Sequence, residues 1–264
     1  MLLYFRVSLL VFLAAFSFIS ASAQLEKAAK PLPFTSGETL TYEGKISRLL
    51  IAISIADVVF TAENIPNSTN YRIRAKATSK GTLLKLFGFS FLQDYESIVD
   101  FTNQRVLKTT KHDVQKERVR DSIADFDYTQ KRVSYVETDP KDRNRPPRRI
   151  ASAIEEPMYD LVTGIYSIRP MKLAVGQNFE VAISDSGLVY NVPVRITKRE
   201  RQKTIFGKVW CWRLEPTVFG KGHLIEQKGN MIIWLMDDDR KIPVRAHVNT
   251  TYGEFDVRLR LASK

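Results

Sequence analysis

The chain has 264 residues, of which 44% are hydrophobic, 26% are charged and 11% are aromatic. This composition excludes a disordered chain and suits one large domain or two small ones. A single cysteine excludes an intrachain disulfide framework and a thiolate metal cluster. The formal net charge of +11 bears on solubility and on the choice of partner, not on the fold.

Residues 1–23 have the pattern of a secretory signal peptide. Arg6 supplies the positive start, residues 7–20 are apolar, and residues 21–23 (ASA) have the small-x-small form of a cleavage site. An uncleaved membrane anchor is the alternative, but the apolar run is short for a span of about 20 residues. We therefore predict that the mature chain is exported, periplasmic or otherwise extracytoplasmic, soluble, and without a transmembrane span.

After an extended lead-in over residues 24–36, the dominant pattern is an alternation of apolar and polar residues. Residues 71–77, 192–197 and 255–261 each place apolar side chains on one face and polar ones on the other. Such half-buried strands, separated by turn signals, are typical of antiparallel sheets. We predict one mainly β domain over residues 37–264, built as a curved antiparallel sheet or a barrel-like or half-barrel sandwich.

One helix is predicted near residues 157–169. Glu156 is suited to cap it, Pro157 to occupy its first position and Pro170 to stop it. The apolar residues at helical spacing are Met158, Leu161, Val162, Ile165 and Ile168.

Residues 81–92 (GTLLKLFGFSFL) are unusually rich in leucine and phenylalanine. Their spacing predicts a short helix up to Phe87 and a strand after Gly88. Two interpretations stay open: the segment lines a pocket for an acyl chain, or it is part of the core. The candidate ligand-binding residues are Leu83, Leu84, Phe87, Phe89 and Phe91.

Two stretches, residues 140–149 and 198–203, are strongly basic. They lack interleaved aromatic residues, so we expect no nucleic-acid partner. An anionic lipid or another acidic envelope component fits an exported protein, and solvated loops are the alternative. The candidate basic patch comprises Arg143, Arg145, Arg148 and Arg149.

Motifs for catalysis, metals and cofactors were not found. The histidines are far apart in sequence, and neither a Gly-x-Ser-x-Gly elbow nor a phosphate-binding loop occurs. The acidic run 237–239 is interpreted as a tight turn, since three consecutive aspartates cannot all face one calcium ion. Cys211, between two tryptophans, is interpreted as a small apolar filler. We therefore predict no catalytic residue, metal site or cofactor.

Several spaced segments resemble the DUF3108 family of exported bacterial proteins. They are residues 37–42 (GETLTY), 94–97 (DYES), 159–169, which end in Tyr-x-x-Arg, and 233–244 (IWLMDDDRKIPV). The resemblance implies an envelope protein with a curved, mostly antiparallel sheet. By analogy it also implies similarity to the open half-barrels that carry lipids or lipoproteins in the periplasm.

The last of these segments predicts a β hairpin. Trp234 is expected to anchor its core side, and Pro243, which lacks an N–H, marks an edge strand or a bulge. Arg240 is expected to pair with Asp237 or Asp238, at a gain under about 1 kcal/mol if the pair is exposed.

The leading hypothesis is a non-enzymatic envelope protein that binds a lipid or other amphipathic ligand on its curved sheet. A second is an assembly or scaffolding module that contacts another envelope protein through an edge strand or a basic loop. A third is a carbohydrate-active hydrolase, which needs two carboxylates in a cleft.

Overall fold

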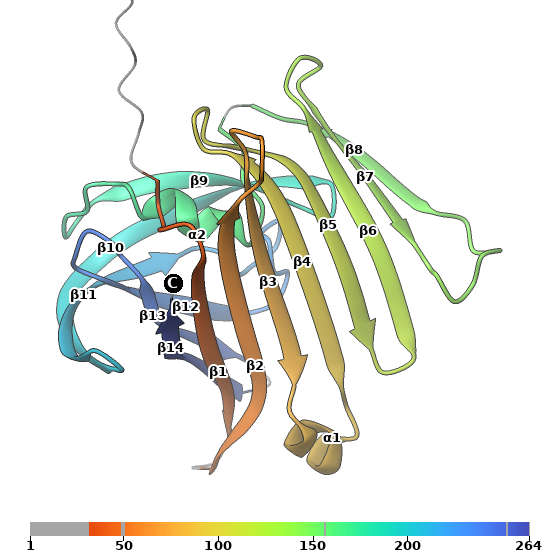
Figure 1. Cartoon of the computed structure of the whole chain (residues 1–264). Coiled ribbons are helices and arrows are strands. Elements are labelled where there is room, and N and C mark those ends of the chain that lie inside the picture. Colours follow the sequence, from red (N-terminus) through yellow and green to blue (C-terminus); the bar gives the residue numbers. More distant parts are fainter. Residues whose placement is uncertain (1–31, 49–50, 156, 252, 264) are drawn as a thin grey trace, which may run out of the picture.

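Antiparallel strands make up most of the chain in the computed structural model, which describes residues 32–48, 51–155, 157–251 and 253–263 (Figure 1). The predicted signal peptide, most of the lead-in and the predicted cap Glu156 lie outside these residues.

The N-terminal half of the sheet contains eight strands and a short helix. These are β1 (Glu38–Arg48), β2 (Ile51–Asn64), β3 (Tyr71–Ser79), α1 (Gly81–Phe87), β4 (Phe91–Asp100), β5 (Arg105–Gln115), β6 (Arg118–Asp127), β7 (Arg132–Thr138) and β8 (Arg148–Ala153). The C-terminal half contains a second helix and six strands. These are α2 (Thr163–Ile168), β9 (Asn178–Asp185), β10 (Leu188–Thr204), β11 (Gly207–Pro216), β12 (Gly229–Met236), β13 (Pro243–Thr250) and β14 (Gly253–Ser263).

All fourteen strands belong to one open sheet, in the order β8-β7-β6-β5-β4-β3-β2-β1-β14-β13-β12-β11-β10-β9. The first and last strands, β1 and β14, pair with each other, and β8 and β9 are the two edges. The sheet is strongly coiled (Figure 1). As a result, the turn between β9 and β10 packs on β7 and β8, where Ser152 Oγ donates a hydrogen bond to the Gly187 carbonyl at 2.7 Å.

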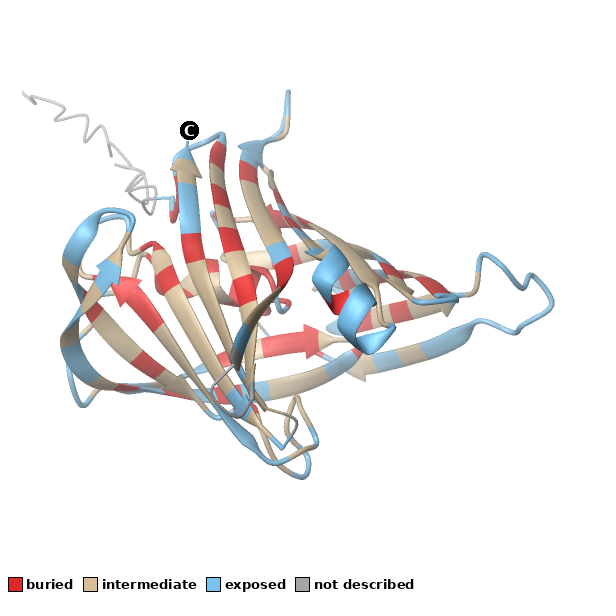
Figure 2. Cartoon of the chain, turned by 90° about the horizontal axis from the view of Figure 1, so that it is seen from below, coloured by how far each residue is buried: buried red, intermediate tan, exposed pale blue. Residues whose placement is uncertain are grey.

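The alternation of apolar and polar residues along the strands explains why one face of the sheet is buried and the other is exposed. In β3, Ile73 and Ala75 are buried, whereas Arg74 and Lys76, which alternate with them, are exposed. Figure 2 shows buried residues recurring along the strands in this way. Because successive side chains of a strand point to opposite faces, one face is left wet, as an antiparallel sheet allows. The predicted fold class, a curved antiparallel sheet with one helix near residues 157–169, is confirmed.

The start of that helix was predicted wrongly. It begins at Thr163 rather than Pro157, and it ends at Ile168, close to the predicted stop. The preceding backbone is extended because strands on both sides bind it: Met158 O accepts from Val106 N–H at 3.0 Å, and Tyr159 N–H donates to Ala182 O at 3.0 Å. A helix would take these groups away from both strands.

The interior surrounds α2, which lies between the apolar faces of the two halves. Val162 and Tyr166 pack into a buried cluster with residues of β2–β7, and Ile168 packs into a cluster with residues of β9–β12. Ile165 contacts both clusters. The helix therefore joins the two halves from inside.

Other local predictions agree with the structure. α1 ends at Phe87 and is followed by β4. Trp234 is buried, and the ladder between β12 and β13 is irregular where Leu235 pairs with Pro243, so Pro243 marks a bulge. Arg240 pairs with Asp238 at 3.2 Å.

Candidate functional site

The ladder between β11 and β12 is short, and this opens the sheet. Residues 211–214 of β11 pair with β12, although β11 continues to Pro216. Beyond them the two strands are no longer paired, and the loop of residues 217–228 connects them. This loop is held by an isolated bridge between Phe219 and Ile225 and by a hydrogen bond from Thr217 N–H to Pro193 O at 2.8 Å.

A cavity of about 370 Å³, here named the inner cavity, lies between α2 and the sheet at this split. Its walls are mostly aliphatic, and they include Leu161, Ile165, Ile168, Ile183, Val192, Val194, Val218, Leu224, Met231 and Ile233. Asp185 is a charged residue on the wall, and its carboxylate accepts a hydrogen bond from Tyr95 Oη at 3.3 Å. The size and lining match those of pockets that bind small apolar molecules.

A second hollow of about 700 Å³, here named the outer hollow, adjoins the inner cavity. The two share Val194, Pro216, Val218 and Met231 as lining residues. The outer hollow is more polar, because Asn178, Glu180, Arg195, Arg213, Glu215 and Asn230 also line it.

Of the two arginines in the outer hollow, only one is committed to a carboxylate. Arg213 pairs with Glu215 at 2.9 Å. Arg195 is exposed and makes no ion pair with the part of the chain that the structure describes. An apolar cavity thus adjoins a surface hollow that offers an uncommitted cation.

A buried ion pair fixes α2 beside the site. Arg169 Nη1 and Nη2 donate to the two carboxylate oxygens of Glu38 at 2.6 and 2.8 Å, and Arg169 Nε donates to Arg240 O at 2.8 Å. Both side chains are almost fully buried. Burial, as the largest cause, raises the pKa of the neighbouring Tyr42 well above its usual range, so this hydroxyl stays protonated. The pair links the first strand, α2 and the β12–β13 turn, which are three of the segments quoted for the family resemblance.

A second buried polar centre lies at Asp160, ahead of α2. Its Oδ1 accepts from the N–H groups of Val162 and Thr163 at 3.0 and 2.8 Å, and its Oδ2 accepts from Ser97 Oγ and Thr109 Oγ1 at 2.5 and 2.6 Å. Asp160 therefore accepts hydrogen bonds from the first N–H groups of α2, a role that the sequence predicted for Glu156. It also links the helix to β4 and β5.

The predicted ligand-binding residues of the 81–92 segment lie elsewhere. Leu83 is buried in a small cluster with Ile55, while Phe87 is 55% exposed. Phe89 and Phe91 are half-buried against the same cluster, and the Leu84 side chain lies outside the described part of the structure. None of the four described residues lines the inner cavity or the outer hollow. A ligand role for this segment stays a prediction.

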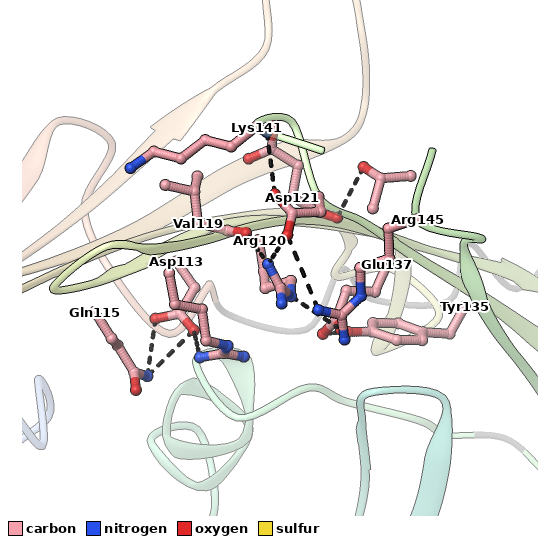
Figure 3. A network of polar contacts seen from close by, with 12 residues as sticks. Asp113, Gln115, Val119, Arg120, Asp121, Tyr135, Glu137, Lys141 and Arg145 are labelled. Carbon is pink, nitrogen blue, oxygen red and sulfur yellow. Dashed lines mark hydrogen bonds and ion pairs between the residues drawn. The ribbon is translucent and has the colours of Figure 1, made fainter. Parts of the chain in front are cut away.

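The predicted basic patch lies on the β7–β8 loop and the start of β8, where all four arginines are exposed. Figure 3 shows the polar network at the base of this loop. Arg120 donates to Asp139 at 2.5 Å, and Arg145 lies 4.0 Å from the same carboxylate. Arg143, Arg148 and Arg149 make no ion pair within the described ranges. Two of these cations start an edge strand, a placement that discourages pairing with another chain.

The described residues offer few other features that could carry a function. Cys211 is fully buried, and burial, as the largest cause, raises the pKa of its thiol to about 12, which fits its interpretation as an apolar filler. Among the described residues, histidine, cysteine and carboxylate side chains form no group of three or more that could hold a metal ion. Nor does any helix in these ranges have the length and apolar character needed to cross a bilayer.

These features define a class: an open, barrel-like β protein coiled around a short helix. The chain belongs to a family described as a protein of unknown function (DUF3108), whose pattern matches residues 39–260. No curated protein matches the sequence.

Two solved structures are similar to this chain to different degrees. A β-barrel-like protein of a domain of unknown function, DUF1849, from Brucella abortus is similar with a TM-score of 0.59 and 8% identity, over 88% of this chain and 99% of that one. A presumed exported protein with a YmcC-like fold from Bacteroides fragilis gives a TM-score of 0.34 at 9% identity, over 89% and 100% of the two chains. The first of these likenesses supports the fold alone.

The inner cavity could not be predicted from the sequence. Its lining residues have the same alternation as core residues elsewhere, so no sequence signal separated a wall from a packed interior. The one usable hint was the pair of glycines in residues 220–222, which marked the loop that parts β11 from β12.

Proposed function

We propose that this protein is an exported, non-enzymatic envelope protein that binds an amphipathic ligand. The apolar part of the ligand occupies the inner cavity, and its polar end reaches the outer hollow near Arg195. The observation that carries the proposal is the inner cavity itself, whose walls are mostly aliphatic.

The ligand class follows from the two linings. Aliphatic walls favour a flexible hydrocarbon chain, because burial of apolar surface contributes roughly 25 cal/mol per Å². Next to this wall, Arg195 favours an anionic end group such as a carboxylate or a phosphate. The combination describes a fatty acid or another single-chain anionic lipid.

The test begins with lipid extraction and native mass spectrometry of the protein purified from the cell envelope. We expect a bound lipid at a fixed stoichiometry. Protein that carries no ligand and takes up no fatty-acid probe would overturn the proposal.

Variants then locate the site. Leu224→Trp places a larger side chain at a half-buried position on the cavity wall, and we expect it to weaken binding of a fluorescent fatty acid at least tenfold. The matched control is Val175→Trp, because Val175 is 56% exposed and lines neither hollow. Leu86→Ser with Phe87→Ser tests α1 as the competing site. Loss of binding in this variant alone would move the ligand to the 81–92 segment.

The polar end is tested separately. Arg195→Gln is expected to weaken a fatty acid about fivefold and to leave the corresponding alcohol unchanged. Equal effects on the two probes would remove Arg195 from the site.

A further inference from the structure

The distal part of the β10–β11 hairpin is a two-stranded ribbon that continues past its pairing with β9 and β12. One face of it lies against β13 and β14, where Arg245 Nη1 donates to Gln202 Oε1 at 3.5 Å. β10 pairs with β9 only over residues 188–195, and β11 pairs with β12 only over residues 211–214. Residues 201–210 therefore lie beyond the three-stranded part of the sheet, although β10 and β11 stay paired up to Thr204 and Gly207. At the base of this ribbon, Asp237 N–H donates to Trp210 O at 2.9 Å.

The two faces of this ribbon differ in chemistry. On the face toward the body, Glu200 Oε1 accepts from Trp234 Nε1 at 2.6 Å, and Cys211 opposite Glu200 is buried. The other face carries three cross-strand rows, which are Arg199 with Trp212, Arg201 with Trp210, and Lys203 with Lys208. The pleat places these rows on one side, so cations and tryptophans share it.

The turn at the end of the ribbon is apolar and exposed. Ile205 and Phe206 are 43% and 37% exposed, and Trp210 behind them is 44% exposed. The Arg199 guanidinium lies 4.5 Å from the Trp210 ring centre. Exposed apolar side chains that lie close together mark a candidate interaction surface.

Most of the positively charged side chains on this surface form no ion pair with the described residues. Arg201, Lys203 and Lys208 form no ion pair with any residue that the structure describes. The carboxylates nearby are engaged: Glu200 accepts from Trp234, and Asp237 pairs with Arg199 at 2.6 Å. Asp238 pairs at 3.2 Å with Arg240, whose guanidinium lies 5.1 Å from the Phe206 ring centre. The distal half of the ribbon therefore presents positive charge around an apolar tip.

We propose that this ribbon docks the protein on an anionic phospholipid bilayer. Ile205 and Phe206 enter the interfacial region, Trp210 lies at headgroup depth, and Arg201, Lys203 and Lys208 contact lipid phosphates. Apolar side chains beside tryptophan and a ring of cations are the combination that binds such interfaces. The inference goes beyond ligand binding in the inner cavity and does not depend on it.

The test is flotation of the natively processed protein with phosphatidylcholine vesicles that do or do not contain phosphatidylglycerol. We expect binding to the anionic vesicles, weakened by added salt because exposed charges are screened. Absence of binding to anionic vesicles, or equal binding to both kinds, would overturn the proposal.

Three variants assign the surface, and circular dichroism checks that each one is folded. Ile205→Ser with Phe206→Ser is expected to lower the partition coefficient at least tenfold. Arg201→Gln with Lys203→Gln and Lys208→Gln is expected to lower it about a hundredfold, since each basic residue at an anionic surface contributes about 1 kcal/mol. The matched control is Leu86→Ser with Phe87→Ser. These two residues are 60% and 55% exposed on α1, and their substitution should change vesicle binding less than twofold.

Depth is read from tryptophan fluorescence with brominated lipids. Quenching that disappears in Trp210→Phe supports insertion of the ribbon. Loss of vesicle binding in the α1 variant instead of the ribbon variants, or binding of an acidic polysaccharide with no affinity for vesicles, contradicts the proposal.

Discussion

In the N-terminal half of the sheet, β2 to β7 each pair with both neighbours in ladders that run along most of the strands, and their buried side chains pack against α2. In the C-terminal half, β11 leaves β12 after residue 214, and the apolar face beneath encloses the inner cavity. The strands of the two halves have the same alternation. Continuity of the ladder, rather than apolar content, therefore decides whether an apolar face packs solidly or keeps a cavity.

The junction between the halves offers the largest expected effect. Arg169→Met would leave the Glu38 carboxylate buried without its partner, and we expect the free energy of unfolding to fall by about 3–5 kcal/mol. The double variant Glu38→Leu with Arg169→Met should recover most of this loss, because it removes both charges. Urea denaturation followed by circular dichroism measures both. A loss below about 1 kcal/mol in the single variant would show that the pair does not hold the halves together.

The second-largest loss of stability is expected at the contact between the β9–β10 turn and the N-terminal half. Gly187 and Gly207 both have positive φ angles, of 79° and 86°. A Cβ atom added at Gly187 would lie 2.6 Å from Tyr135 Cβ. A Cβ atom added at Gly207 would meet no other atom within 4 Å. Gly207→Ala should cost about 1 kcal/mol in backbone strain. Gly187→Ala should cost about 2 kcal/mol more, because it also overpacks the contact. Equal melting temperatures of the two variants would mean that this turn does not close the coil.

The smallest expected effect is the difference between truncating a buried valine in the N-terminal half and truncating one in the C-terminal half. Val133 is fully buried in the packed half, and Val192 is 3% exposed on the wall of the inner cavity. Val133→Ala should lower the free energy of unfolding by about 2 kcal/mol, and Val192→Ala by about 1 kcal/mol, since a residue beside a cavity has fewer contacts to lose. A larger loss at Val192 in denaturant titrations would indicate that the C-terminal half is the better packed one.

Much of the fold could be predicted from local pattern. Alternation identified β3, β10 and β14, and the spacing of residues 81–92 identified α1 and the strand after it. The helix start could not be predicted, because it depends on hydrogen bonds that Met158 and Tyr159 make with strands far away in sequence.

The candidate site was beyond local pattern for the same reason. Val192 and Val194 alternate as core residues do, and only the separation of β11 from β12 turns them into a cavity wall. The 81–92 segment attracted attention by composition, yet its described side chains divide between a small core cluster and solvent.

The sequence by itself determined the fold class, the family and the basic, cysteine-poor character of the chain, because these depend on composition, on a period of two and on motifs within a few residues. The tertiary structure alone decided where the first strand meets α2 through Glu38 and Arg169, which are 131 positions apart. It also decided which apolar face stays hollow and which of the two basic stretches joins exposed aromatic residues. Those outcomes depend on strand pairing and coiling over the whole chain, which no local pattern encodes.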